Sequence, residues 1–230
     1  MSQYRTVFPK PHTLIVVVHV MDSEQALRNV LIARDEGADG VFLINHQTNH
    51  LHLSSCFKYI RGRCPDFWIG LNYLDLDKYN ALRLLPSGAQ GLWDDNAQID
   101  LDQMNPQYEA SEFASRRAET GKEALYFGGV AFKYQRTSRD PAKEASLAVP
   151  YVDVITTSGD GTGIAANLSK IQSMKAAIGD HPLAIASGIT PENVKDYMPH
   201  ADCFLVATGV GFSDTELNPQ RVRELVQAIS

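Results

Sequence analysis

Three short segments near the C-terminus combine glycine with serine or threonine, and this combination is suited to binding an anion. The segments are residues 157–163, 187–190 and 207–211. Glycine allows backbone N–H groups to come close to an anion, and neighbouring hydroxyl groups add further donors. We therefore predict a phosphate-binding site, although the glycines could instead serve only to form tight turns. The predicted phosphate contacts are Gly161, Thr162, Gly163, Ser187, Gly188, Thr208 and Gly209.

Three ionisable side chains, His19, Asp94 and Lys133, each follow an apolar run and could carry out catalysis. His19 would titrate near neutral pH, and Asp94 could act as a general acid or base. Lys133 could pair with a phosphate, act as a base, or supply the amine of a Schiff base. The alternatives are a hydrogen-bonded core histidine, a capping or solvated aspartate, and a solvated lysine. Adjacent strand residues face opposite sides, so only one of Asp94 and Asp95 can point inward, and we predict Asp94.

Short β-rich runs alternate with helical patterns along the whole chain. Strands are expected at residues 14–20, 40–44, 67–71, 90–93, 125–132, 152–157, 183–186 and 203–207. Helices are expected at residues 22–36, 52–62, 77–85, 106–121 and 167–178, and further helices begin at Pro141, Thr190 and Pro219. Such alternation is typical of a parallel sheet, and eight strand–helix pairs predict an α/β fold of the (β/α)8 barrel (TIM barrel) class. Residues 1–230 would then form one domain; an open, doubly wound sheet is the alternative.

The barrel prediction brings the candidate residues together. Active sites of (β/α)8 barrels lie at the C-terminal ends of the strands, and the loops after strands seven and eight often bind phosphate. Asn45, Asn72 and Thr157 also fall at predicted strand ends, and we expect them to contact the ligand. A bulky residue at Gly188 is expected to block the phosphate site while leaving most of the fold intact.

Composition excludes several other classes of protein. The chain has 230 residues and a formal net charge of −6, with no basic cluster that would favour a nucleic-acid partner. The longest apolar run, residues 14–18, is too short to cross a membrane, and no secretory signal pattern is present, so a cytoplasmic protein is expected. Three cysteines without a CxxC motif argue against a disulfide framework or a structural zinc site, and Cys56 and Cys64 are expected to be buried in a helix.

A histidine-rich segment at residues 46–52 is the one stretch that suggests metal binding. Its histidines do not have the spacing of a helical metal motif, and the segment has no carboxylate of its own. We therefore expect neither a metal nor a cofactor. The expected partner is a phosphorylated small molecule, and a homo-oligomer is possible.

The chain resembles the BtpA family, (β/α)8 proteins named for a photosystem I biogenesis factor and related to the ribulose-phosphate-binding barrels. The resemblance covers almost the whole chain and is clearest over residues 152–224. The segment 152–163 resembles the family's sixth strand and TG-containing loop, 186–194 resembles its GSGVT-x-ENV signature, and 201–208 resembles its last strand. His19, Asn45 and Lys133 stand where the family carries a His, an Asn and a Lys. The resemblance implies the barrel fold and anion binding.

Three positions depart from the family pattern. Residues 21–24 replace a Gly-Pro-rich first loop, Ile44 replaces an acidic residue, and residues 211–213 replace lysines after strand eight.

Two hypotheses for the function follow. In the first, the protein is an enzyme that acts on a phosphorylated sugar or nucleotide-like molecule by isomerisation, aldol-type cleavage or glycosyl-phosphate chemistry. In the second, it is a non-catalytic assembly or regulatory factor that binds a phosphorylated ligand.

Overall fold

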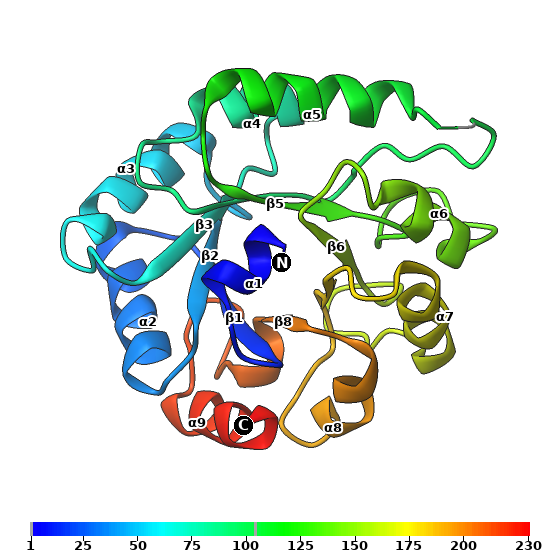
Figure 1. Cartoon of the computed structure of the whole chain (residues 1–230). Coiled ribbons are helices and arrows are strands. Elements are labelled where there is room, and N and C mark those ends of the chain that lie inside the picture. The colour runs from blue at the N-terminus through cyan, green and yellow to red at the C-terminus, as the bar shows by residue number, and fades with distance from the viewer. Residues whose placement is uncertain (1, 104) are drawn as a thin grey trace.

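The computed structural model, which describes residues 2–103 and 105–230, contains eight parallel strands closed into a barrel (Figure 1). The strands are β1 (Thr13–His19), β2 (Gly40–Ile44), β3 (Trp68–Asn72), β4 (Gly91–Asp94), β5 (Leu125–Gly129), β6 (Val154–Thr157), β7 (Leu183–Ile185) and β8 (Cys203–Val206). Each strand pairs with the next, and β8 returns to pair with β1, so that Leu14 lies opposite Phe204. The (β/α)8 barrel is therefore confirmed, and closure by β8 excludes the open sheet.

Helices surround the barrel. They are α2 (Ser23–Asp35), α3 (His50–Arg61), α4 (Lys78–Leu84), α5 (Tyr108–Thr120), α6 (Pro141–Ala148), α7 (Leu168–Ile178), α8 (Val194–Tyr197) and α9 (Pro219–Ile229). Side-chain caps begin most of them; Asp22, for example, accepts hydrogen bonds from the backbone of Glu24 and Gln25. No helix in the described part of the chain is long and apolar enough to cross a membrane. Cys56, Cys64 and Cys203 are free thiols in the buried core. Cys56 lies in α3 as expected, whereas Cys64 lies beyond the end of that helix.

Large aromatic side chains fill the N-terminal half of the barrel interior. Phe42 and Trp68 pack edge to face, with ring centroids 5.2 Å apart. Glycines on the neighbouring strands make room for them, since a Cβ at Gly40 would lie 2.7 Å from the Trp68 ring and one at Gly91 would lie 2.5 Å from it. Because this half is solidly packed, a ligand can enter only toward the other end of the strands.

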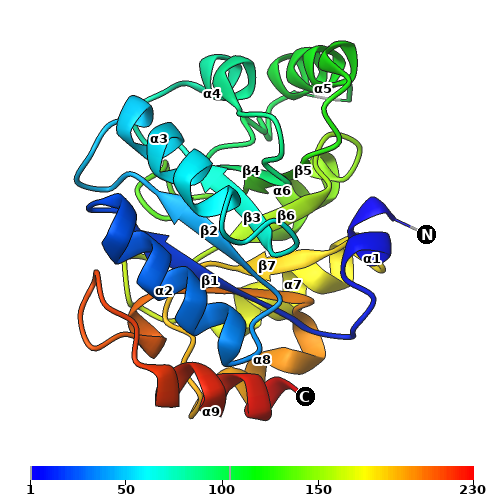
Figure 2. The ribbon, with the colours of Figure 1, turned by 90° about the vertical axis from the view of Figure 1, so that its left-hand side faces the viewer.

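A short helix that the sequence did not predict, α1 (Gln3–Val7), covers the N-terminal ends of the strands (Figure 2). In Figure 1 it crosses the centre of the ring of strands. Its Tyr4 is fully buried, and the phenol group donates hydrogen bonds to Thr13 Oγ1 at 2.9 Å and to the Asp202 carbonyl at 3.1 Å. The helix therefore closes the end of the barrel opposite the predicted active site.

Several element boundaries differ from the predictions. Strand β5 ends at Gly129 instead of residue 132, because Ala131 takes a positive φ of 47° that a strand cannot continue through. Helix α5 begins at Tyr108, two residues after Pro106. The helix expected at Thr190 begins as a hydrogen-bonded turn, since Thr190 accepts hydrogen bonds from Asn193 and Val194, and α8 starts only at Val194.

Candidate functional site

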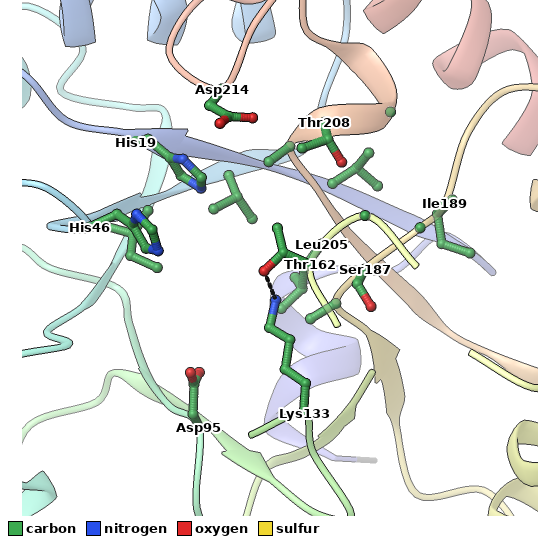
Figure 3. Close-up of a pocket in the computed structure, with 18 of the residues that line it drawn as sticks. His19, His46, Asp95, Lys133, Thr162, Ser187, Ile189, Leu205, Thr208 and Asp214 are labelled. Carbon is green, nitrogen blue, oxygen red and sulfur yellow. Dashed lines mark hydrogen bonds between the residues drawn. The ribbon is translucent and has the colours of Figure 1, made fainter. Parts of the chain in front are cut away.

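A cavity of about 230 Å³ opens at the C-terminal ends of the strands (Figure 3). Its floor is formed by inward-facing strand residues, namely Val17, Ile44, Trp93, Ala186 and Leu205. Its wall is formed by the loops that follow the strands, and the ionisable residues among them are His19, His46, Asp95, Lys133 and Asp214. Six of the seven predicted phosphate contacts line the cavity, and the exception is Gly161, which is buried beside it.

Four backbone N–H groups that follow β7 and β8 have no acceptor among residues 2–103 and 105–230. Among the hydrogen bonds of the described residues, none uses the backbone N–H of Gly188, Ile189, Thr208 or Gly209 as a donor. All four residues line the cavity. Because unpaired backbone donors are rare in folded proteins, four at one cavity wall indicate that a ligand or solvent supplies the acceptor.

The glycines in these loops also allow the loops to pack tightly on one another. A Cβ at Gly209 would lie 1.9 Å from the Ile189 carbonyl oxygen, and one at Gly188 would lie 2.1 Å from the backbone nitrogen of Ala165. Gly188 in addition has a φ of +66°. A bulky side chain at Gly188, which is expected to block the phosphate site and leave most of the fold intact, would therefore also push the loop after β6 away.

The hydroxyl groups of the site have different roles. Ser187 Oγ accepts a hydrogen bond from the Gly159 N–H at 3.0 Å and donates one to the Ile164 carbonyl at 3.0 Å, so it joins two loops. Thr162 Oγ1 lies 3.1 Å from the Tyr134 hydroxyl group. Thr208 Oγ1 makes no hydrogen bond among the described residues, and it is the hydroxyl group that remains available to a ligand.

The predicted inward orientation of Asp94 is not what the structure shows. On β4, Trp93 faces the barrel interior, so the pleat directs Asp94 outward and Asp95 inward. Asp94 accepts a hydrogen bond from the Tyr126 hydroxyl group at 3.4 Å, and burial raises the pKa of its carboxyl group to about 6 despite the nearby Lys78. Asp95 lines the cavity and accepts a hydrogen bond from Asn72 Nδ2 at 3.2 Å, and burial raises its pKa as well.

The three predicted ligand contacts at strand ends are buried beside the cavity, and none of them lines it. Asn72 positions Asp95 as described. Asn45 accepts a hydrogen bond from the Leu74 N–H at 2.8 Å and donates one to Asp75, which connects the loops after β2 and β3. Thr157 Oγ1 donates to the Ala131 carbonyl at 3.3 Å. In this structure these side chains organise the loops that carry the site.

Lys133 lines the cavity, as its place after β5 predicts. Its Nζ group lies 3.5 Å from Thr162 Oγ1 and forms no ion pair among the described residues (Figure 3). Burial lowers the pKa of the ammonium group, and the nearby Asp95 carboxylate partly opposes this effect. A partly buried amine with one long hydrogen bond is unlike a solvated surface lysine.

His19 lies in the cavity wall and stacks on His46, with ring centroids 5.4 Å apart and ring planes inclined by 15° (Figure 3). Burial is the main effect that lowers the pKa of His19, and the neighbouring His46 and Lys133 lower it further, whereas Asp214 opposes them. His19 is therefore neutral at physiological pH, the form in which an imidazole can accept a proton.

This arrangement predicts the titration behaviour of His19. In the wild type, the His19 imidazole should titrate at a lower pH than a free histidine, and His46→Asn should raise the His19 pKa because it removes a neighbouring group that lowers it. NMR spectra of the imidazole C–H groups over a pH series would measure the shift. His200→Asn is a suitable control, because His200 is paired with Gln172 on a different element. An unchanged His19 pKa in His46→Asn would show that the two rings do not interact.

The remaining histidines of segment 46–52 point to different partners. His50 Nδ1 lies 2.8 Å from Asp75 Oδ2, whereas His52 Nε2 lies 3.0 Å from the Met21 carbonyl oxygen. No group of three or more His, Cys, Asp or Glu side chains suited to a metal ion is found within residues 2–103 and 105–230.

The barrel is similar to several solved structures. Phosphoribosyl anthranilate isomerase from Thermus thermophilus has a TM-score of 0.68 at 15% identity, over 94% of this chain and 97% of that one. A native KDPGal structure has a TM-score of 0.68 at 18% identity, over 94% and 93%. The (S)-3-O-geranylgeranylglyceryl phosphate synthase from Thermoplasma acidophilum, in complex with its substrate sn-glycerol-1-phosphate, has a TM-score of 0.67 at 15% identity, over 99% and 96%. At such identities the similarity establishes the fold.

No protein-family model matches the sequence, and a search of curated proteins found no match.

Sequence reasoning missed His46, Asp95 and Asp214 as residues of the cavity. Asp95 and His46 carried a usable signal, since each follows the end of a predicted strand. Asp214 lies within a loop, and nothing in its spacing predicts that it approaches His19.

Proposed function

We propose that the protein is an enzyme that acts on a phosphorylated small molecule and holds its phosphate group between the loops after β7 and β8. The observation that carries this proposal is the set of unpaired backbone N–H groups at Gly188, Ile189, Thr208 and Gly209. Several converging N–H groups can bind an anion without a nearby cation. The overall charge of −6 would not attract an anion, so the site must do so locally.

The ionisable groups lie elsewhere on the cavity wall, where the rest of the substrate would be. Figure 3 shows Asp95 and the His19–His46 pair facing the cavity. Lys133 lies between Asp95 and the loops after β7 and β8, which are called the phosphate loops below. A neutral His19 can accept a proton, and a carboxyl group with a raised pKa such as Asp95 can donate one. Binding of the phosphate group would fix one end of the substrate, and the energy of that binding would position the reacting end.

The known proteins of similar fold support this reading. A phosphoribosyl anthranilate isomerase and a synthase bound to sn-glycerol-1-phosphate share the architecture, and both act on phosphate esters. The resemblance of residues 152–224 to the BtpA proteins and the ribulose-phosphate-binding barrels points to the same kind of ligand. Isomerisation, aldol-type cleavage and glycosyl-phosphate chemistry all use acid and base groups next to a bound phosphate.

The alternative is a non-catalytic factor that binds a phosphorylated ligand, and the departures from the BtpA pattern at Ile44 and residues 211–213 favour it. In such a protein the side chains of His19, Asp94 and Lys133 would point away from one another and would not share one cavity. His19 and Lys133 instead both line the cavity, together with Asp95 in place of Asp94. This convergence favours the enzyme.

Calorimetric titration tests the phosphate site directly. Ribose 5-phosphate should bind the wild type at least about tenfold more tightly than ribose, because only the phosphate ester can accept from the unpaired donors. Thr208→Val, which removes the unpartnered hydroxyl group, should reduce this preference, whereas Thr120→Val at the far end of α5 should not. Equal binding of ribose and ribose 5-phosphate would contradict the proposal.

A further inference from the structure

Lys133 is held in an unusual way for a lysine at the mouth of a barrel. The backbone on both sides is strained, with φ angles of 47° at Ala131 and 62° at Tyr134. The Lys133 N–H donates a hydrogen bond to Ser158 Oγ at 2.8 Å, which ties it to the loop after β6. Strained backbone that neighbouring contacts hold in place occurs mainly at functional sites.

A second lysine, which does not line the cavity, holds the strained turn at Ala131 in place. Lys170, on α7, donates hydrogen bonds from Nζ to the Ala131 carbonyl at 2.5 Å and to the Ser158 carbonyl at 2.9 Å. Thr157 Oγ1 also donates to the Ala131 carbonyl. Three side chains outside the cavity are thus used to fix the segment that directs Lys133 into it.

In contrast, the amine at the end of this fixed segment makes few contacts. The Lys133 Nζ group has one hydrogen bond, at 3.5 Å, to Thr162 Oγ1 and no ion pair among the described residues. Asp95 faces the same cavity from β4 and contributes to the electrostatic environment of this amine without contacting it. A positioned, partly buried and weakly bonded amine is suited to covalent catalysis by lysine, and a nearby carboxyl group can transfer the protons that such a reaction needs.

We propose that Lys133 is a nucleophile that forms an imine with the substrate, and that the substrate is therefore a phosphorylated aldehyde or ketone. This inference rests on the proposed function, since the phosphate loops would place the carbonyl group near Lys133. Burial lowers the pKa of Lys133, which increases the fraction of free amine at neutral pH.

The reaction proceeds by addition and then loss of water. The Nζ lone pair attacks the carbonyl carbon to form a C–N bond, while a proton moves from nitrogen to the carbonyl oxygen, giving a carbinolamine. The Asp95 carboxylate, which takes up a proton when the Lys133 ammonium group becomes the free amine, then donates that proton to the hydroxyl group, which leaves as water as the nitrogen lone pair forms the C=N⁺ bond. The products are the protonated imine, one water molecule and the Asp95 carboxylate.

Reductive trapping tests this proposal without knowledge of the natural substrate. The protein is incubated with limiting glycolaldehyde phosphate and sodium cyanoborohydride, which delivers hydride to the imine carbon, and the labelled lysines are identified by peptide mass spectrometry. We expect Lys133 to be labelled at least about tenfold faster than the exposed Lys143, because it is both positioned and less protonated. Lys133→Arg should remove that label, Lys143→Arg should not, and Asp95→Asn should slow the labelling of Lys133.

The outcomes separate this proposal from that of the phosphate site. Labelling of Lys133 no faster than that of Lys143 would overturn the imine proposal, even if ribose 5-phosphate still binds. Fast labelling of Lys133 at equal rates by glycolaldehyde and glycolaldehyde phosphate would support the nucleophile and contradict the phosphate site. Labelling that is fast only with the phosphorylated aldehyde supports both.

Discussion

Replacement of Gly209 by alanine is expected to weaken phosphate binding at least about tenfold and to lower the free energy of unfolding by about 1–3 kcal/mol. The new Cβ would lie 1.9 Å from the Ile189 carbonyl oxygen, a backbone atom that cannot move without the loop that contains it. The loops after β7 and β8 must then separate. The residues with unpaired N–H groups line the cavity on both of these loops, so separation is expected to spread the donors too far apart to bind one anion.

Gly62→Ala is the matched control for this change. Gly62 follows α3 with a φ of −62°, and the nearest atoms to an added Cβ lie at 3.6 and 3.7 Å, so alanine fits there. Its effect on stability should stay within about 1 kcal/mol, since alanine mainly restricts the unfolded chain. Calorimetry with ribose 5-phosphate and urea unfolding would measure both effects. Gly209→Ala with wild-type affinity would show that the phosphate does not bind between these loops.

Replacement of Lys170 by methionine should lower the free energy of unfolding by about 2–4 kcal/mol, because two carbonyl groups lose a charged donor. Those carbonyls belong to Ala131 and Ser158, on the loops after β5 and β6. Methionine fills the space of the lysine side chain without donating a hydrogen bond. The strained turn at Ala131 would lose its main support, so the position of Lys133 should become less defined.

The control for this change is Lys58→Met, an exposed lysine on α3 that should affect stability by no more than about 0.5 kcal/mol. Urea unfolding measures the stability of both variants, and reductive trapping measures the labelling of Lys133. We expect slower labelling of Lys133 in Lys170→Met and an unchanged rate in Lys58→Met. If Lys170→Met is as stable as the wild type, the two hydrogen bonds do not support the turn.

The sequence by itself determined the architecture and the end of the barrel that carries the site. The strand and helix patterns are local, because each depends on residues within one element, and eight such pairs in one chain leave few packing solutions. Closure by the β8–β1 pairing then places residues 157–163, 187–190 and 207–211 on one rim. The prediction that Lys133 faces the cavity followed from the rule that active sites of (β/α)8 barrels lie at the C-terminal ends of the strands.

Only the tertiary structure decided which side chains meet at the cavity. Strands of a parallel barrel are buried on both faces, so their sequences show no alternation that could tell Asp95 from Asp94. The stacking of His46 on His19 and the hydrogen bonds from Lys170 to Ala131 join residues 27 and 39 positions apart. Such contacts depend on the register of the closed barrel and on the conformations of its loops. Local sequence does not encode either of them, and for this reason the His19–His46 stacking and the inward position of Asp95 became visible only once the chain was folded.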